Sequence, residues 1–172
     1  MNKYMERGTI MKRIPYDREK AIAYAEEWAY KRNRRYLDFE NIGGDCTNFA
    51  SQCIYAGCGV MNYTKTFGWY YNSPDDRAPA WTGVQQLYNF LTQNRGVGPF
   101  GIETGINGAE PGDIIQLGNS QGEFYHSPVV VAIINGLPYV AAHTFDTYMR
   151  PLSSYIYGKA RVIHIATVLD WD

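Results

Sequence analysis

The hydrophobic pattern of the chain changes once, near residue 91, and this change limits the folds that the chain can adopt. Up to Leu91, apolar residues recur at helical spacing. After Leu91, they fall into short runs rich in β-branched residues, and turn residues separate these runs. Helices followed by a series of strands predict the α+β class, with N-terminal helices packed on a C-terminal antiparallel β-sheet.

Three helical segments are expected before residue 92. The first begins after Asp17, a suitable N-cap residue, and runs to about Asn33. The second covers Cys46–Ala56, and Gly57 closes it. The third helix presents one apolar face, formed by Trp81, Val84, Leu87, Tyr88 and Leu91.

Four strands are expected after a Gly-rich loop at residues 95–108. They are Asp113–Leu117, His126–Ile134, Leu137–Thr144 and Arg161–Leu169. Residues 1–14 are polar and basic, so we expect a flexible N-terminal tail there. The remaining residues, 15–172, are enough for a single domain of ordinary size.

The charge of the chain argues against two classes of partner. Its 16 Lys and Arg residues nearly balance 17 Asp and Glu residues, which gives a formal net charge of −1. We therefore expect no nucleic acid as a partner, and no stretch is apolar enough for a membrane span. The start of the chain lacks the apolar region of an export signal, which predicts a cytoplasmic protein as written. A cell-wall location is expected instead if such a signal was removed or lies outside this sequence, and the oligomeric state stays open.

The cysteines argue against a metal site and indicate one reactive thiol. No CxxC pair is present and the histidines lie far downstream, so we expect neither a metal nor a cofactor. Cys46 directly follows Gly43-Gly44-Asp45, at the first turn of the second expected helix. There the backbone N–H groups and the helix dipole favour the thiolate, which is the nucleophilic form. We interpret the two remaining cysteines, Cys53 and Cys58, as buried structural residues.

The expected hairpin relates two histidines to each other. Asn135-Gly136 between two apolar runs predicts a two-residue type I′ turn. If the strands pair directly up to this turn, His126 and His143 become diagonal neighbours on one side of the sheet. If the loop is one residue longer, His126 instead faces Asp146. A helix-start thiolate, an imidazole on a strand and a group that orients the imidazole form a nucleophile–base–orienter arrangement.

Several separated motifs resemble one known family. The longest is Gly43–Cys53; the others are Tyr16-Asp17-Arg18, Trp81–Val84, Pro111–Gln116, Tyr125-His126-Ser127 and His143-Thr144. Together and in this order they resemble the bacterial putative amidase domain, a relative of the NlpC/P60 and CHAP cysteine hydrolases with papain-like folds. The resemblance extends from about Tyr16 to Leu152.

This resemblance implies a site and an activity. It implies Cys46 as the nucleophile, His126 as the general base and His143 as the orienter, in a papain-like fold. It also implies hydrolysis of amide bonds in bacterial cell-wall (peptidoglycan) peptides. Two alternatives stay open, because an acyltransferase or transpeptidase would use the same dyad and a binding module would hold such a peptide without cleaving it.

Aromatic residues follow the helix that carries Cys46. Trp69, Tyr70 and Tyr71 lie in the irregular stretch after this helix, and Trp81 lies beside it. In a papain-like layout that stretch lines the cleft, which makes Trp69, Tyr70 and Trp81 candidates to contact substrate, with packing in the core as the alternative. We expect the cleft where Cys46 meets the strand that bears His126, and we interpret His164 as structural.

Overall fold

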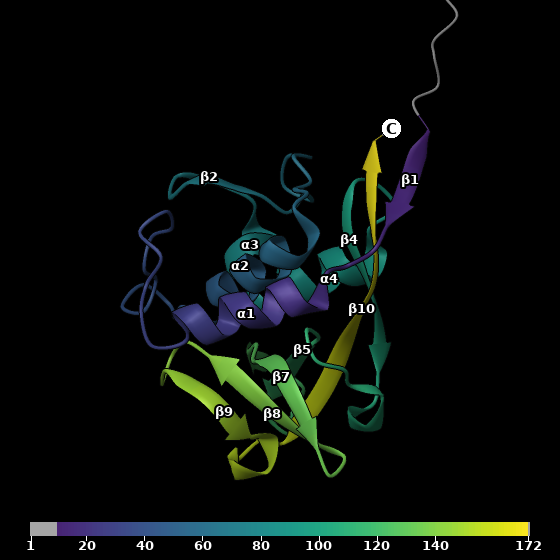
Figure 1. Cartoon of the computed structure of the whole chain (residues 1–172). Helices are drawn as coiled ribbons and strands as arrows, with labels where there is room; N and C mark the ends of the chain where they lie inside the picture. The colour runs from purple at the N-terminus through teal and green to yellow at the C-terminus, as the bar shows by residue number, and fades with distance from the viewer. Residues whose placement is uncertain (1–9, 172) are drawn as a thin grey trace, which may run out of the picture.

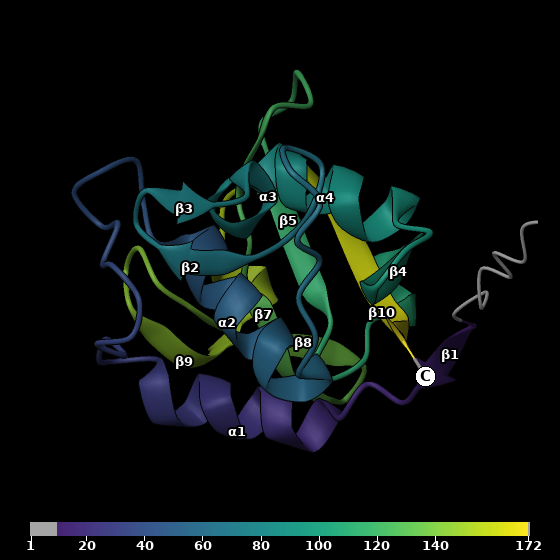
Figure 2. The ribbon, with the colours of Figure 1, turned by 90° about the horizontal axis from the view of Figure 1, so that it is seen from above.

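The computed structural model describes residues 10–171 and has helices on one face of a bent antiparallel sheet (Figure 1). The predicted α+β class is therefore confirmed. Helix α2 lies in the middle of the helical layer, with α1 on one side and α3 and α4 on the other (Figure 2). The helices are α1 (Arg18–Trp28), α2 (Cys46–Cys58), α3 (Pro79–Thr82) and α4 (Val84–Gln93), and the 3-10 turns are η1 (Ile106–Gly108) and η2 (Leu152–Ser154).

The large sheet follows the order β1-β10-β5-β7-β8-β9. In addition, β4 pairs with β10, and β6 pairs with β5. Strand β10 is the longest and forms antiparallel pairs with β1, β4 and β5. The strands of the large sheet are β1 (Met11–Ile14), β4 (Gly98–Thr104), β5 (Ile114–Gly118), β6 (Phe124–His126), β7 (Val129–Ile134), β8 (Leu137–Ala142), β9 (Thr147–Pro151) and β10 (Lys159–Trp171). Strands β2 (Tyr71–Ser73) and β3 (Asp76–Arg77) form a separate pair.

The helix starts agree with the sequence better than the helix ends do. The Asp17 side chain caps α1 by accepting a hydrogen bond from the Lys20 amide at 3.0 Å. However, α1 ends at Trp28, before Asn33. Helix α2 runs past Gly57, and Gly59 ends it in the left-handed conformation with φ 68°.

Gly83 divides the third predicted helix into α3 and α4. Its extended backbone, with φ −102° and ψ 129°, ends α3, and its carbonyl accepts a hydrogen bond from the Leu87 amide in the first turn of α4. The single predicted helix is thus two helices, and Gly83 is the C-cap of the first and the N-cap of the second.

The strands differ from the expected ones in several places, and the sequence does not predict β2, β3 and β9. The predicted strand 126–134 is interrupted at Ser127 and Pro128, between β6 and β7. The segment expected to be a Gly-rich loop contains β4, which pairs with β10. Of the expected tail at 1–14, residues 1–9 lie outside the described part of the chain, and Met11–Ile14 form β1 against β10.

The main hydrophobic core lies between the helices and the sheet, and a smaller one lies on the opposite sheet face. The main core includes Phe49, Trp69 and Trp81. The smaller core includes Leu117 and Val130. Successive residues of a strand point to opposite faces, so each central strand contributes to both cores.

Asp113, just before β5, joins three parts of the fold. Its side chain has no exposed surface and accepts hydrogen bonds from Arg18 of α1 at 2.8 Å and from the Ile165 amide of β10 at 3.0 Å. It also accepts one from the Glu110 amide at 2.9 Å and lies 3.0 Å from Nδ1 of His164. The structural interpretation of His164 agrees with this contact.

Gly57 is the point where α2 passes closest to the start of α1. A Cβ atom there would lie 2.4 Å from the Tyr16 ring and 2.7 Å from the Asp17 carbonyl oxygen. We therefore expect Gly57→Ala to lower the free energy of unfolding by about 1–3 kcal/mol, as overpacking does. Urea unfolding followed by Trp fluorescence measures this change. The matched control is Gly105→Ala, because a Cβ at Gly105 meets nothing within 4 Å; equal losses in both variants would contradict the prediction.

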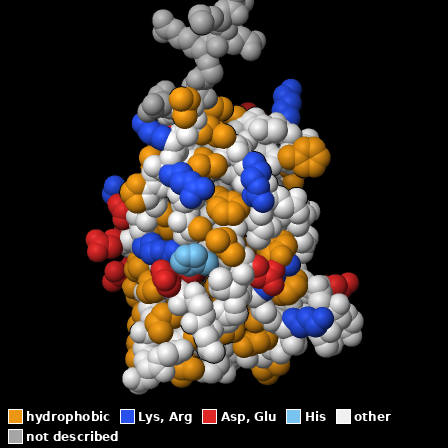
Figure 3. Space-filling model, turned by 90° about the vertical axis from the view of Figure 1, so that its right-hand side faces the viewer, with side chains coloured by type: hydrophobic (Ala, Val, Ile, Leu, Met, Phe, Trp, Pro, Cys, Tyr) orange, Lys and Arg blue, Asp and Glu red, His pale blue; other side chains and the backbone are white. Residues whose placement is uncertain are grey.

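The surface over β1, β4 and β10 mixes charges of both signs. Figure 3 shows acidic, basic and hydrophobic side chains interspersed on this face, so neither sign dominates it. Among the described residues, no helix has both the length and the apolar character that crossing a bilayer requires.

Candidate active site

Cys46 occupies the first position of α2 and faces the strand that carries His126. Its Sγ lies 4.0 Å from the Tyr125 carbonyl oxygen, and the Ser127 amide donates toward the sulfur. These two peptide groups flank His126 on either side. The structure thus brings the Cys46 sulfur to the backbone of His126, although no hydrogen bond joins their side chains within residues 10–171.

Burial has the largest effect on the pKa of the Cys46 thiol. The residue is 7% exposed, and this burial raises the pKa of the thiol above its ordinary value of 9.0. Hydrogen bonds from the Ser127 and Thr47 backbone act in the opposite direction but do not outweigh burial. This direction is opposite to the favoured thiolate that the sequence predicts, because the helix start lies in the interior and burial favours the neutral thiol.

A buried polar chain supports the segment around Cys46. Thr47 Oγ1 lies 3.8 Å from the sulfur and donates to Ser127 Oγ at 3.2 Å. Ser127 Oγ also accepts a hydrogen bond from Gln116 Nε2 at 3.2 Å, and Gln116 Oε1 accepts one from Arg161 at 2.7 Å. Sequence reasoning missed Thr47, Ser127 and Gln116 as supports. Their signal was weak, since only the proximity of Thr47 to Cys46 and of Ser127 to His126 indicated a role.

The His126 ring lies against the second sheet face. His126 pairs with Leu117 of β5, which belongs to the smaller core, and cross-strand partners share a face. Its ring centroid lies 5.8 Å from that of Tyr155. Within the described residues, neither ring nitrogen has a hydrogen-bond partner.

Burial lowers the pKa of His126 from 6.5 to about 4, and the positive charge of Arg150 adds to this effect. At neutral pH the imidazole is therefore neutral and able to accept a proton. The resting pair at this site is a neutral thiol and a neutral imidazole.

An NMR titration should show His126 changing its charge near pH 4. Between pH 6.5 and 4 the unfolded chain binds a proton at His126 and the folded chain does not, so stability should fall as pH falls through this window. Tyr155→Ala should raise the pKa toward 6.5, because it uncovers the ring. A pKa near 6.5 in the unmodified protein would contradict the burial of His126.

A β-bulge separates His126 from His143. At the turn the pairing is as predicted, since Ile134 faces Leu137 and both Asn135 and Gly136 have positive φ. A register shift between Val130 and Ala132 then changes the pairing by one residue. A shift of one residue moves side chains to the opposite face, so the expected diagonal contact of the two histidines does not form.

His143 binds Asp45 instead. Its Nδ1 lies 2.5 Å from Asp45 Oδ2, and its Nε2 lies 2.8 Å from the Trp28 carbonyl oxygen. The ring is 1% exposed and stacks on Phe49 with centroids 4.0 Å apart. Both ring nitrogens face oxygen atoms, so in this structure neither orients His126. Because Asp45 directly precedes Cys46, this contact holds the start of α2 in place.

Asp45 is the functional candidate that the sequence reasoning overlooked. Its Oδ1 accepts hydrogen bonds from the Phe39 amide at 2.9 Å and from Asn48 Nδ2 at 2.8 Å, and the residue has no exposed surface. The signal was an acidic residue beside the candidate nucleophile. Its partner His143 could not be identified without the register of the hairpin.

The alternative orienter, Asp146, is also engaged elsewhere. Its two carboxylate oxygens accept hydrogen bonds from Arg32 at 2.8 and 2.9 Å. The structure therefore assigns neither His143 nor Asp146 to the His126 ring.

The predicted substrate contacts are mostly core residues. Trp69 and Trp81 have no exposed surface, with ring centroids 4.8 Å apart. Their indole N–H groups donate to Ser51 and Asn48, both at 3.0 Å, so neither ring is available to a substrate. Tyr70 lies beside Tyr63 and keeps part of its surface, so contact with a substrate stays a prediction for Tyr70 alone.

Comparison with known proteins gives one family and two relatives. Residues 15–166 match the family described as "Putative amidase domain". The uncharacterized protein YhbB of Bacillus subtilis (strain 168) is 33% identical over 152 residues, which are 84% of this chain and 47% of YhbB. The uncharacterized protein YjcM of the same strain is 26% identical over 147 residues, or 81% of this chain and 33% of YjcM. The chain thus spans less than half the length of either relative, and no solved structure matches it.

Proposed function

The chain belongs to the putative amidase domain family, and on this premise we propose that it hydrolyses amide bonds with Cys46 as the nucleophile and His126 as the general base. The observation that supports this most is the position of the Cys46 sulfur against the two peptide groups that flank His126. The relationship to NlpC/P60 and CHAP hydrolases and to their papain-like fold belongs to the same proposal.

The neutral pair defines the order of the chemical steps. In the structure the His126 ring lies on the second sheet face, so the proposed reaction requires a rearrangement of residues 125–127 that brings the ring to the sulfur when substrate binds. The ring then accepts the thiol proton while the sulfur attacks the carbonyl carbon. The imidazolium then gives this proton to the leaving amine, which leaves a thioester. Water, deprotonated by His126, attacks the thioester, and the acid leaves while the proton returns to the sulfur.

The start of α2 supplies the anion site for this reaction. Asp45, the N-cap residue, makes no side-chain cap hydrogen bond to α2, and the Thr47 amide of the first turn is directed at the Cys46 sulfur. Backbone N–H groups of this turn and the positive end of the helix dipole stabilise the oxyanion of the tetrahedral intermediate. The Asp45–His143 contact keeps this turn in position.

The substrate class that we propose is a peptide of the bacterial cell wall. The motifs that resemble those of cell-wall hydrolases support this choice. Which bond of the peptide is cleaved is determined by identifying the products in the assay below.

The assay uses peptides that carry D-amino acids, matched all-L peptides and simple acyl amides, with products identified by mass spectrometry. We expect cleavage of at least one peptide and a transient acyl group on Cys46. Incorporation of ¹⁸O from labelled water into the acid identifies hydrolysis, whereas transfer to an added amine identifies an acyltransferase. Unchanged substrates and no acyl adduct in every reaction would contradict the proposal.

One observation favours a second candidate, a binding module without turnover. Among the described residues, no hydrogen bond joins the side chains of Cys46 and His126, and burial raises the pKa of the thiol. Such a module would bind the peptide equally well after Cys46→Ser. Equal peptide affinity of the two forms, with no product from either, would favour this candidate.

A further inference from the structure

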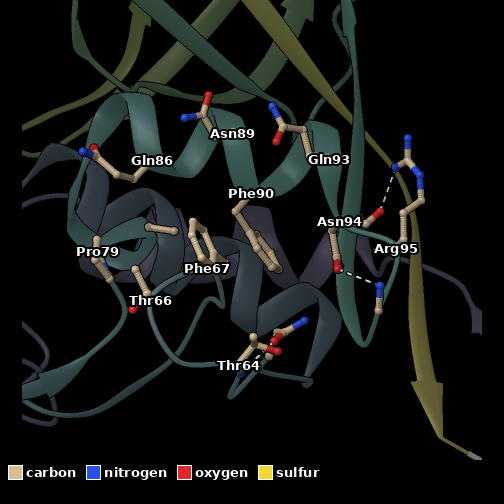
Figure 4. A pocket seen from close by; sticks show the side chains of 13 residues that line it. Thr64, Thr66, Phe67, Pro79, Gln86, Asn89, Phe90, Gln93, Asn94 and Arg95 are labelled. Carbon is tan, nitrogen blue, oxygen red and sulfur yellow. Dashed lines mark hydrogen bonds between the residues drawn. The ribbon is translucent and has the colours of Figure 1, made fainter.

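A groove lies at the far end of α2 from Cys46. Its first hollow, of about 610 Å³, lies between α4 and the loop at residues 62–67 (Figure 4). A second hollow of about 570 Å³ shares Asn62, Thr64 and Gly96 with the first, so the two adjoin. The second hollow includes Gly59, the C-cap of α2. Since α2 has 13 residues, about 20 Å separate the groove from Cys46.

Three carboxamide side chains line the first hollow from α4. Gln86, Asn89 and Gln93 are spaced three and four residues apart, so they lie on one side of the helix (Figure 4). Within residues 10–171, the side chains of Gln86 and Gln93 make no hydrogen bond. Asn89 accepts one from Gln85 at 2.8 Å and keeps its own donors free. A carboxamide both donates and accepts, as the hydroxyl groups of a sugar require.

Aromatic rings accompany these amides. Phe67 is 82% exposed and lies beside Phe90, whose buried ring stacks on Trp69 with centroids 6.0 Å apart (Figure 4). The second hollow has two more exposed rings, Tyr63 at 61% and Trp171 at 51%. Exposed rings offer flat apolar surfaces against which the C–H face of a sugar packs.

The charge of the lining selects a neutral ligand. Among the described residues, the lining carries one charge of each sign, so the two charges balance. Arg95 at the first hollow donates to the Asn94 carbonyl oxygen and covers the Phe100 ring, and Asp170 at the second hollow accepts a hydrogen bond from the Trp171 amide at 2.8 Å. An extended peptide is best held by an exposed strand edge, whereas this hollow is built from a helix and a loop. The adjoining hollows suit a chain of sugar units better than a single unit.

We propose that this groove binds a neutral linear oligosaccharide. Phe67 packs on one sugar ring, and Gln86, Asn89 and Gln93 form hydrogen bonds with its hydroxyl or acetamido groups. The site is separate from Cys46 and does not depend on the proposed amide hydrolysis.

Calorimetry with chitohexaose and cellohexaose tests this site in the full chain carrying Cys46→Ala, which removes any turnover. We expect at least one of the two hexasaccharides to bind. Phe67→Ala should weaken the affinity for this sugar about 10-fold, and Gln93→Ala should weaken it less. The matched control is Phe145→Ala, since Phe145 is 86% exposed and lies outside both hollows. Binding should be unchanged in this control.

Three results would overturn the proposal. One is the absence of binding by both hexasaccharides at millimolar concentration. Another is equal binding by the Phe67→Ala, Gln93→Ala and parent proteins, and the third is tighter binding of an uncharged peptide than of either sugar. Circular dichroism confirms that the variants are folded, which is expected because both side chains face the groove. Since binding is measured without catalysis, failure here leaves the amidase proposal untouched, and failure of hydrolysis leaves this site untouched.

Discussion

Cys46→Ala is expected to reduce amide hydrolysis by about 10⁴-fold or more, the loss that follows removal of a catalytic nucleophile. The reason is chemical, because no other side chain takes the position of the sulfur at the start of α2. The contacts of the thiol in the structure are long, 3.8 Å to Thr47 Oγ1 and 4.0 Å to the Tyr125 carbonyl oxygen, and the Ser127 and Thr47 amides donate toward a sulfur, which is a weak acceptor. Its removal should therefore leave the fold intact. Turnover of the best peptide, measured by mass spectrometry, checks this result.

Cys58→Ser is the matched control for this experiment. Cys58 is buried to the same extent as Cys46 and lies at the other end of α2, where a serine hydroxyl can keep the hydrogen bond to the Val60 carbonyl oxygen. Turnover should persist in this variant. If Cys46→Ala keeps more than a tenth of the parental rate, then the sulfur is not the nucleophile.

The largest effect on stability is expected from Asp113→Ala. The substitution removes a carboxylate that has no exposed surface. It deprives Arg18 of its buried ion-pair partner and leaves the Ile165 and Glu110 amides without this acceptor. Breaking a buried ion pair in this way costs about 3–5 kcal/mol. Urea unfolding followed by Trp fluorescence measures the loss, since Trp69 and Trp81 are buried in the main core.

Glu110→Ala provides the comparison, because Glu110 contacts the same arginine from the surface. Its side chain is 59% exposed and lies 3.6 Å from Arg18 Nε. Exposed ion pairs contribute about 0–1 kcal/mol, so this variant should be nearly as stable as the parent. Similar losses in the two variants would show that Arg18 does not depend on Asp113.

The local features of the chain were predictable, and the register of the hairpin was not. Asn135-Gly136 specifies its own turn through positive φ angles, and Asp17 specifies the start of α1 through its side chain, so each acts within a few residues of its own position. The bulge beside Val130 depends on how β7 and β8 pack, which no short pattern encodes. This one residue decides whether His143 faces His126 or Asp45. The sequence therefore indicated candidate residues, whereas the contacts of His143 and Asp146 depend on the tertiary structure.

Tertiary contacts also explain why β4 was not predicted as a strand and why Trp69 and Trp81 lie in the core and not in a cleft. The segment of β4 contains Gly98, Pro99 and Gly101, which disfavour a strand, and it is extended because β10 pairs with it. Trp69 and Trp81 suit either a cleft or a core by composition. Their burial follows from packing among helices α2, α3 and α4, which sequence patterns alone do not reveal.

Strand β10 has a consequence for the synthesis of the protein on the ribosome. It pairs with β1, β4 and β5, segments that are made long before it. Until residue 171 has left the exit tunnel, these three strands each have an unpaired edge, and β10 does not yet cover the core beneath α1 and α2. From the synthesis of β1 until that point, the nascent chain is thus exposed to wrong pairing. Closure of the sheet must be a late step that joins residues more than 150 positions apart, as the pairing of Met11 with Trp171 requires.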